Sequence, residues 1–310
     1  MANRRKRQSK QQIKIVFALL AAILLLLLAY FRPDLYDKLL GKEPVVLDPE
    51  YPPQGDRSDE IPGKLQIHYI DVGQGDATLF ITPDGHTALV DAGPGDHKED
   101  LCTYLHDVGV KRLDMVFFTH PHEDHIGGGT SILEEFEVSR VYLSDFVSNT
   151  STFERLLLTM DEKGISPIVL YPGDKLSFFG CSVSVLGPVE PDDKNANNAS
   201  LVLRFVYGST SFLFSGDAEK EAENKVLAKY PFSLRSDVFQ VGHHGSSTSN
   251  TEAFLKAISP SIAVISCELD NEYGHPHPEI VSALLSAGIR VYRTDLQGNI
   301  LLLSDGKTVS

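Results

Sequence analysis

The stretch that most constrains this chain is Thr119-His120-Pro121-His122-Glu123-Asp124-His125-Ile126-Gly127-Gly128. Three histidines and an aspartate fall within six positions, directly after an apolar run, Met115 to Phe118, that predicts a buried strand. Neutral imidazoles and carboxylates are ligands that zinc and similar divalent metals prefer. Ligands so close in sequence cannot all face one way from a regular strand or helix. The stretch therefore predicts a loop wrapped around two metal ions.

The four candidate ligands divide between the two ions. We assign His120 and His122 to one ion, and Asp124 and His125 to the other. The alternative is a histidine-rich surface turn. The strand before the stretch and the run of glycines after it favour a site built at a strand-to-helix junction instead.

Three more polar clusters follow predicted strands and supply candidate partners. Asp217 has two carboxylate oxygens and can bridge two cations, although the cap of the following helix is its alternative role. Of the pair His243 and His244, we assign His243 to the ion of His120 and His122. His244 is then a supporting residue or the proton donor to the leaving group. His275 is the predicted last ligand of the second ion, with Asp124, His125 and Asp217.

The N-terminal segment predicts a membrane anchor. Residues 15–31 carry no charge and follow six basic residues within residues 1–14. A helix of this length spans roughly 25 Å, near the lower limit for a bilayer core of about 30 Å. The basic tail predicts a cytoplasmic N-terminus and an extracytoplasmic body. A cleaved signal peptide is the alternative. Residues 32–62, rich in proline from residue 42 onward, predict a linker, and residues 63–310 a single domain.

The charge of the chain limits which partners it can bind, and its cysteines indicate no disulfide framework. The net charge is -14, and without the six N-terminal cations 22 basic residues face 42 acidic ones, a balance of -20. A body this acidic does not bind nucleic acid broadly by electrostatics, so a nucleic-acid substrate would have to be held locally. Cys102, Cys181 and Cys267 form neither a CxxC pair nor a disulfide framework, and we expect each to be a small buried residue. No feature predicts a nucleotide cofactor.

The patterning of residues 63–310 is that of an α/β protein with meandering strands and alternating helices. Two mixed sheets packed face to face, with helices outside, accommodate this order. Helices are expected over the ranges 97–108, 128–136 and 218–229, and after the strands at 237–241 and 262–266. The other strands are expected at 65–70, 77–81, 87–90, 115–118, 175–179, 183–186, 201–207 and 211–215, and near 141 and 169. Val291 and the range 300–303 are expected to close the sheet.

The histidine stretch resembles the HxHxDH signature of the metallo-β-lactamase superfamily. That resemblance implies an αββα sandwich with one or two metals at one edge between the sheets. It also implies that Asp91 orients the ligand loop through hydrogen bonds, although a turn aspartate before glycine is the alternative.

Further phrases resemble the C-terminal hydrolase domain of ComEC-type competence proteins and their free-standing relatives, over essentially residues 65–303. They include Asp71-Val72-Gly73-Gln74-Gly75-Asp76-Ala77, Asn197-Asn198-Ala199-Ser200-Leu201-Val202-Leu203 and Gly242-His243-His244-Gly245-Ser246. The chain departs from these proteins in having one apolar segment rather than a polytopic channel. It also lacks the usual third-motif histidine, a gap that His243 is expected to fill.

These features lead to three functional hypotheses. The first is a membrane-anchored, extracytoplasmic phosphodiesterase or nuclease that uses a water activated by two divalent ions, zinc being expected and manganese possible. The second is hydrolysis of a small ester, lactone or choline phosphodiester. The third is a non-catalytic, metal-stabilised binding module. Asp124, Asp217 and His244 are the expected catalytic residues, and Gln74, Asp76, Asn198 and Ser200 are expected to support the site or contact substrate.

Overall fold

The computed structural model describes residues 63–190 and 194–310. The predicted basic tail, membrane helix and linker, residues 1–62, lie outside these residues. Within the described ranges, no helix combines the length and the apolar character needed to cross a bilayer.

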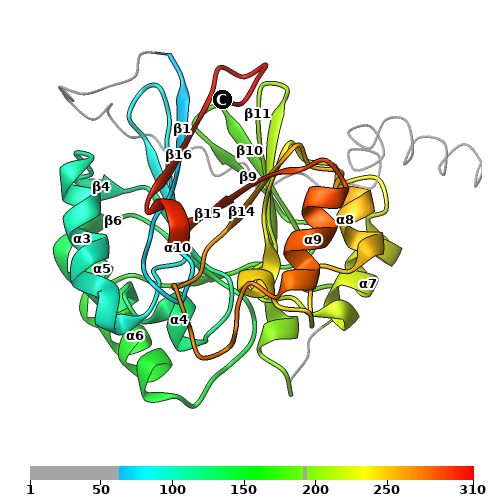
Figure 1. The fold of residues 1–310 in the computed structure, drawn as a ribbon. Helices are drawn as coiled ribbons and strands as arrows, with labels where there is room; N and C mark the ends of the chain where they lie inside the picture. Colours follow the sequence, from blue (N-terminus) through cyan, green and yellow to red (C-terminus); the bar gives the residue numbers. More distant parts are fainter. Residues whose placement is uncertain (1–62, 191–193) are drawn as a thin grey trace, which may run out of the picture. The chain divides into compact units, whose positions relative to one another are not determined.

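Two seven-stranded mixed sheets pack face to face, with helices on their outer faces (Figure 1). The first sheet runs in the order β16 (Ile300–Ser304), β1 (Leu65–Tyr69), β2 (Thr78–Ile81), β3 (Thr87–Val90), β5 (Met115–Phe118), β7 (Val141–Leu143) and β8 (Ile168–Val169). The second runs in the order β15 (Arg290–Arg293), β14 (Ile262–Ile265), β13 (Val238–Gln240), β12 (Thr210–Phe214), β11 (Val202–Tyr207), β10 (Cys181–Gly187) and β9 (Lys175–Phe178). A separate pair joins β4 (Arg112–Leu113) and β6 (Glu137–Val138).

Helices cover the outer face of each sheet (Figure 1). The first sheet is covered by α3 (Lys98–Asp107), α5 (Gly129–Glu135) and α6 (Ser151–Glu162). The second is covered by α7 (Lys220–Lys229), α8 (Glu252–Ile258) and α9 (Pro278–Ser286). Shorter turns are η1 (Gly95–His97), α4 (Glu123–Ile126), η2 (Asn197–Ala199), η3 (Gly242–Gly245) and α10 (Thr294–Gln297).

Three apolar layers stabilise this arrangement. The central layer lies between the sheets, where Phe80 of β2 stacks on Phe205 of β11 with ring centroids 4.5 Å apart. The other two layers lie between each sheet and its helices. Burial of this apolar surface on both faces of each sheet explains why most strands carry apolar residues at consecutive positions. The three cysteines are free and buried, as predicted.

The predicted sandwich is confirmed, although the short pair of β4 and β6 was not predicted and two further points differ. Val291 and residues 300–303 were expected to close one sheet, but β15 and β16 are the edge strands of different sheets. Helix α6 was not predicted. It begins after Thr150, whose hydroxyl accepts a hydrogen bond from the backbone N–H of Phe153, which is a helix-capping signal that the sequence does carry.

The sheets are built so that parallel strands end at the same edge. In the first sheet β3, β5, β7 and β8 are parallel, and in the second β12, β13, β14 and β15 are parallel. The residues that follow parallel strands in an α/β protein lie together at the carboxyl edge. The polar clusters after β3, β5, β12, β13 and β14 therefore meet in one place.

Candidate metal centre

Asp91, at the end of β3, fixes the start of the histidine loop. Its carboxylate accepts hydrogen bonds from the backbone N–H of Thr119 (2.7 Å), from the Thr119 hydroxyl (2.8 Å) and from Nδ1 of His125 (2.9 Å). All three residues are buried. The bond to Nδ1 sets the tautomer of His125 and leaves its Nε2 available as a ligand. These are the hydrogen bonds that the sequence led us to expect of Asp91.

The histidine loop contains a single helical turn, α4. His122 occupies its N-cap position in extended backbone, so His120 and His122 precede the turn while Asp124 and His125 lie within it. The change of backbone direction separates the two pairs. The loop thus presents the pairs to different places, as the spacing of the ligands predicted.

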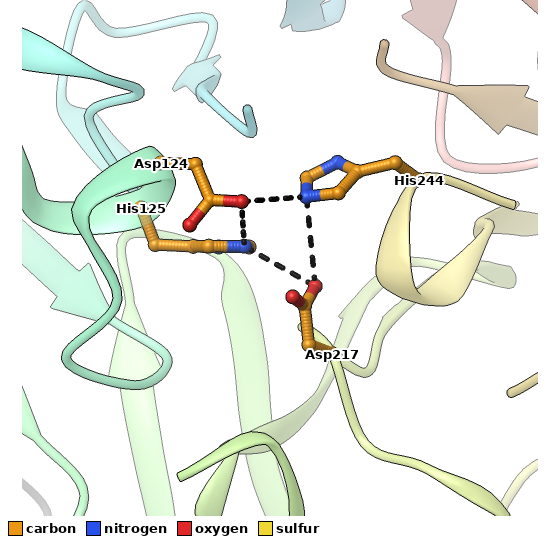
Figure 2. Close-up of side chains that lie close together, drawn as sticks. All are labelled: Asp124, His125, Asp217 and His244. Atoms are coloured by element: carbon orange, nitrogen blue, oxygen red, sulfur yellow. Dashed lines mark hydrogen bonds and ion pairs between the residues drawn. The ribbon is translucent and has the colours of Figure 1, made fainter. Parts of the chain in front are cut away.

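Asp124, His125, Asp217 and His244 form one group, with their polar atoms turned toward one another (Figure 2). His125 Nε2 lies 3.2 Å from Asp217 Oδ1 and 3.9 Å from Asp124 Oδ2. His244 Nε2 lies 3.2 Å from Asp124 Oδ2 and 3.8 Å from Asp217 Oδ1. The residues come from α4, from the loop after β12 and from η3.

His120, His122 and Asp217 form a second group. His120 Nε2 lies 3.1 Å from His122 Nδ1 and 3.6 Å from Asp217 Oδ2. His243 Nε2 also lies 3.6 Å from Asp217 Oδ2. One oxygen of Asp217 therefore faces each group, which is the arrangement of a carboxylate that bridges two ions. The alternative role of Asp217 as a helix cap is wrong, because Glu219 occupies the N-cap position of α7.

The donor atoms fit divalent ions in two respects. His125 Nε2 and Asp217 Oδ1 are buried and, among the described residues, have no hydrogen-bond partner. Buried polar atoms normally find a partner, so these two are placed for a ligand. Donor atoms about 2.05 Å from a tetrahedral ion lie about 3.3 Å from one another. The distances of 3.2 to 3.9 Å in the first group are close to that value.

Burial and charge act together on these groups. Burial alone would lower the pKa of His125, but the carboxylates of Asp217, Asp91 and Asp124 outweigh it and raise that pKa well above its usual range. The same balance holds at His244. Burial would lower the pKa of this histidine, but the carboxylates of Asp217 and Asp76 raise it well above its usual range. The same imidazoles hold the pKa of the Asp217 carboxyl well below its usual range, despite its burial. The floor of the site is thus organised around ionised carboxylates, which attract cations.

Gly216 allows Asp217 to reach the histidines. Its backbone has φ +48, and a Cβ there would lie 2.8 Å from the Thr119 hydroxyl oxygen and 3.0 Å from the Ser200 hydroxyl oxygen. Ser200 Oγ accepts a hydrogen bond from the backbone N–H of Asp217 (3.1 Å). Only glycine fits a left-handed position this close to its neighbours. The Gly-Asp pair is therefore a single structural unit.

The two histidines of η3 sit on a strained turn. His243 has φ +52 and His244 φ +53. Asn250 spans the turn: its amide Nδ2 donates to the carbonyl oxygens of Gly242 (2.8 Å) and Ser246 (3.2 Å), and its Oδ1 accepts from the backbone N–H of Gly242 (3.0 Å). The left-handed backbone turns the two adjacent side chains to different groups. This is why both histidines reach the site.

The group that contains Asp124, His125 and Asp217 differs from the predicted one at one position. Its fourth member is His244, not His275. His244 Nδ1 donates to the carbonyl oxygen of Ser266 (3.0 Å), which directs Nε2 at the carboxylates. His275 instead lies in the wall of the cavity described below, 3.5 Å from the side-chain nitrogen of Gln74. The sequence could not separate these histidines, since each follows a strand of the same sheet.

The remaining predicted residues fall into supporting and lining positions. Asp76 is buried, with Oδ1 3.5 Å from His244 Nδ1. Asn198 and Ser200 are buried and do not line the cavity; Asn198 Oδ1 accepts from the backbone N–H of Glu219 (3.2 Å). The neighbouring Asn197 lines the cavity instead.

A cavity of about 880 Å³ opens above the two groups. Its lining includes residues that the sequence did not single out. One of them, His97, lies in η1 after β3. The others lie between β14 and α9: Glu268, Leu269, Asp270, Asn271, Glu272 and Tyr273. The sequence signal for the last six was their position directly after an apolar strand. Their mixed polar composition marks them as a loop but predicts no chemistry.

The profile of the Metallo-beta-lactamase superfamily matches residues 70–268. The chain belongs to the metallo-β-lactamase superfamily. Among curated proteins, it is 34% identical over 253 residues to "ComE operon protein 3" of Bacillus subtilis, a match that covers 76% of this chain and 32% of that protein. It is 28% identical to "Competence protein ComA" of Neisseria gonorrhoeae, covering 92% of this chain and 38% of that protein. The chain thus spans about a third of the length of these relatives.

Two solved structures share the fold of this chain at low sequence identity. The protein YhfI from Bacillus subtilis superposes with a TM-score of 0.55 at 15% identity, covering 78% of this chain and all of that one. CmlA, a diiron β-hydroxylase from Streptomyces venezuelae, gives the same TM-score and identity over 78% of this chain and 54% of that one. Likeness at this level identifies the αββα architecture.

Proposed function

We propose that this metallo-β-lactamase-fold chain is a metal-dependent phosphodiesterase. The observation that carries the proposal is Asp217, whose two oxygens face two separate histidine groups at the floor of one cavity. Paired ions bridged in this way suit hydrolysis of phosphate esters. The relatives named for competence support a DNA strand as one form of the substrate.

The ions would be held by His120, His122, His243 and Asp217 on one side, and by Asp124, His125, His244 and Asp217 on the other. Two divalent ions, zinc by expectation and manganese as the alternative, would lower the pKa of a water to near neutrality and offset charge on the phosphoryl oxygens. Hydrolysis forms one P–O bond to the water oxygen and breaks the P–O bond to the leaving alcohol, which receives one proton.

The chain's own residues prepare the site for this step. Asp91 and Ser200 hold His125 and Asp217 in place through the hydrogen bonds described above. Both ring nitrogens of His244 are engaged, Nδ1 by the Ser266 carbonyl and Nε2 by the carboxylates, so we assign it to holding an ion rather than to proton donation. His243 is the more exposed of the pair, and its Nδ1 lies 3.1 Å from the Thr248 hydroxyl.

The direct test is hydrolysis of bis-p-nitrophenyl phosphate and of single-stranded DNA by the purified full-length chain. We expect turnover that a chelator removes and that added zinc or manganese restores. Asp217→Asn keeps the size of the side chain but weakens its bridging charge, and it should abolish turnover. A metal-loaded protein that cleaves neither substrate would refute the proposal.

We further propose that the domain is anchored in the cell membrane and lies outside the cytoplasm. The support is the uncharged segment 15–31 after six basic residues. External protease added to intact cells should remove a C-terminal tag from the chain. Protection of the tag in intact cells, with digestion after lysis, would place the domain in the cytoplasm.

A second candidate is hydrolysis of a small ester, lactone or choline phosphodiester. It is favoured by the negative lining of the cavity, which holds seven acidic residues and, among its described residues, no Lys or Arg. A long polyanion gains little from such walls. Comparing turnover of small diesters and of DNA by the same preparation separates the two candidates.

A further inference from the structure

Negative charge dominates the cavity above its floor. Asp124 and Asp217 belong to the groups that would hold ions, and the other five acidic lining residues are exposed: Asp96, Glu123, Glu268, Asp270 and Glu272. Two divalent ions would offset the charges of Asp124 and Asp217 and of the buried Asp76 and Asp91 beside the histidines. The ions themselves would then present positive charge to a ligand at the floor, whereas the exposed part of the lining would stay negative.

Three of these carboxylates, Glu268, Asp270 and Glu272, lie on one exposed loop after β14, which we call the acidic rim. The loop is held in shape by Asn271, whose Nδ2 donates to the carbonyl oxygens of Glu268 (2.8 Å) and His275 (2.6 Å). Its Oδ1 accepts from the backbone N–H of His275 (3.0 Å). The acidic rim is therefore fixed at the mouth, and a ligand there would not have to order the loop first.

An aromatic surface accompanies the acidic rim. Tyr273 is 59% exposed, and its ring stacks on His275 with centroids 5.6 Å apart and planes inclined by 22°. The face of an exposed aromatic ring attracts cations, quaternary ammonium groups in particular. Carboxylates beside the ring add to this attraction. The same surroundings repel a nucleic-acid strand, which carries a negative charge at every phosphate.

The floor of the same cavity carries the atoms that would hold the ions and, through them, the phosphate of a substrate. Asp217 Oδ1 and His125 Nε2 are fully buried there and, among the described residues, have no hydrogen-bond partner. A ligand with negative charge at one end and positive charge at the other would complement both parts of the cavity.

We propose that the substrate is a small phosphodiester whose alcohol portion carries an amine or quaternary ammonium, with its phosphate at the floor and its cation between the acidic rim and Tyr273. This inference rests on the proposed phosphodiesterase activity, and it excludes a nucleic-acid strand as the preferred substrate.

The test uses the metal-loaded full-length chain in a neutral detergent and three substrates. p-Nitrophenylphosphorylcholine and ethyl p-nitrophenyl phosphate share a leaving group and differ in the cation, and a single-stranded oligonucleotide supplies the polyanion. We expect kcat/KM for the choline diester to exceed that for the ethyl diester about tenfold at low salt, and the ratio to shrink as salt screens the acidic rim. The oligonucleotide should be the poorest substrate per bond.

Neutralising the acidic rim should reverse this order in part. The triple variant Glu268→Gln, Asp270→Asn and Glu272→Gln should bring the ratio of the two small diesters close to one and raise cleavage of the oligonucleotide severalfold. The matched control removes three exposed acidic charges that do not line the cavity, by Glu137→Gln, Asp161→Asn and Glu162→Gln, and should keep the wild-type ratio. Tyr273→Ala should lower the ratio more than Tyr273→Phe.

Binding of choline, measured by saturation-transfer NMR, distinguishes failure of this inference from failure of the proposed function. If the chain cleaves the small diesters equally and the rim variant changes neither ratio nor choline binding, the inference is wrong while the proposed function stands. If the oligonucleotide is the preferred substrate, the inference is also wrong. If no diester is cleaved, the proposed function fails, and choline binding that depends on the acidic rim then decides whether the mouth selects cations.

Discussion

Asn250 offers the sharpest test of how the fold builds its candidate metal centre, because it contacts no donor atom yet clamps the turn that presents His243 and His244. Each histidine in left-handed backbone costs about 1–2 kcal/mol, so the turn stores about 2–4 kcal/mol. Asn250 is 3% exposed and makes three hydrogen bonds across the turn, at 2.8, 3.0 and 3.2 Å. Each contributes about 1 kcal/mol. The stabilisation from the three hydrogen bonds of Asn250 is therefore similar in size to the backbone strain of the turn.

Removal of the clamp should let the turn relax. For Asn250→Ala we expect a loss of about 3 kcal/mol in the free energy of unfolding, since three hydrogen bonds are removed and both buried backbone groups of Gly242 lose their Asn250 partner. We also expect metal affinity to fall about 10–100-fold, the usual effect of removing a residue that orients a ligand. Asn250 itself has φ +65, so alanine adds about 1 kcal/mol of strain that Asn250→Gly does not. The glycine variant isolates the hydrogen bonds.

The assays are urea unfolding of the metal-free protein and competition with a chromophoric chelator for zinc. Ser249→Ala is the matched control, because Ser249 is the buried neighbour of Asn250 and its hydroxyl has no hydrogen-bond partner among the described residues. If both Asn250 variants keep their zinc affinity within twofold of Ser249→Ala, the turn does not need the clamp and our reasoning is wrong.

Two other predictions concern titratable side chains. Asp124→Ala and Asp217→Ala should each lower turnover by about a thousandfold or more. The circular dichroism spectrum should stay unchanged, because both side chains line the floor of a cavity. Retained turnover in either variant would count against paired ions. Burial lowers the pKa of His68 to about 4, below its value of about 6.5 in the unfolded chain. Between these two pH values the unfolded chain binds a proton that the folded chain does not, so the free energy of unfolding falls as the pH drops from about 6.5 to 4. Relative to His68→Gln, the wild type should lose about 3 kcal/mol over that range in urea titrations, and parallel pH curves for the two proteins would contradict this.

Glu223 extends the clamp around η3 into α7. Its carboxylate, 1% exposed, accepts hydrogen bonds from the backbone N–H groups of Asn250 and Thr251. Burial raises the pKa of this carboxyl, and the two N–H donors act against that rise. The helix that covers the second sheet is thereby tied to the turn that carries the candidate ligands. The centre is thus held from behind by the scaffold as well as from within.

Much of the candidate centre was visible in local sequence. The histidine stretch, Asp91 and Asp217 each follow a strand whose consecutive apolar residues predict burial, and short-range chemistry marks them as ligands or supports. The confirmed sandwich has the same origin, since strand and helix periods are local properties. What local patterns cannot supply is the position of the strands in their sheets. β15 and β16 follow one another in sequence, yet they are edge strands of different sheets.

The sequence by itself determined which residue types gather at strand ends, and therefore that a site rich in histidine and carboxylate exists. Only the tertiary structure decided which of these residues belong to each ligand group. The left-handed turn places His244 with Asp124 and His125 and leaves His275 in the cavity wall. It also decided that the loop after β14 contributes three carboxylates to the lining of the cavity. The physical reason is the same in each case: donor sets and cavity walls depend on distances between residues far apart in the chain, and those distances are set by the packing of the two sheets.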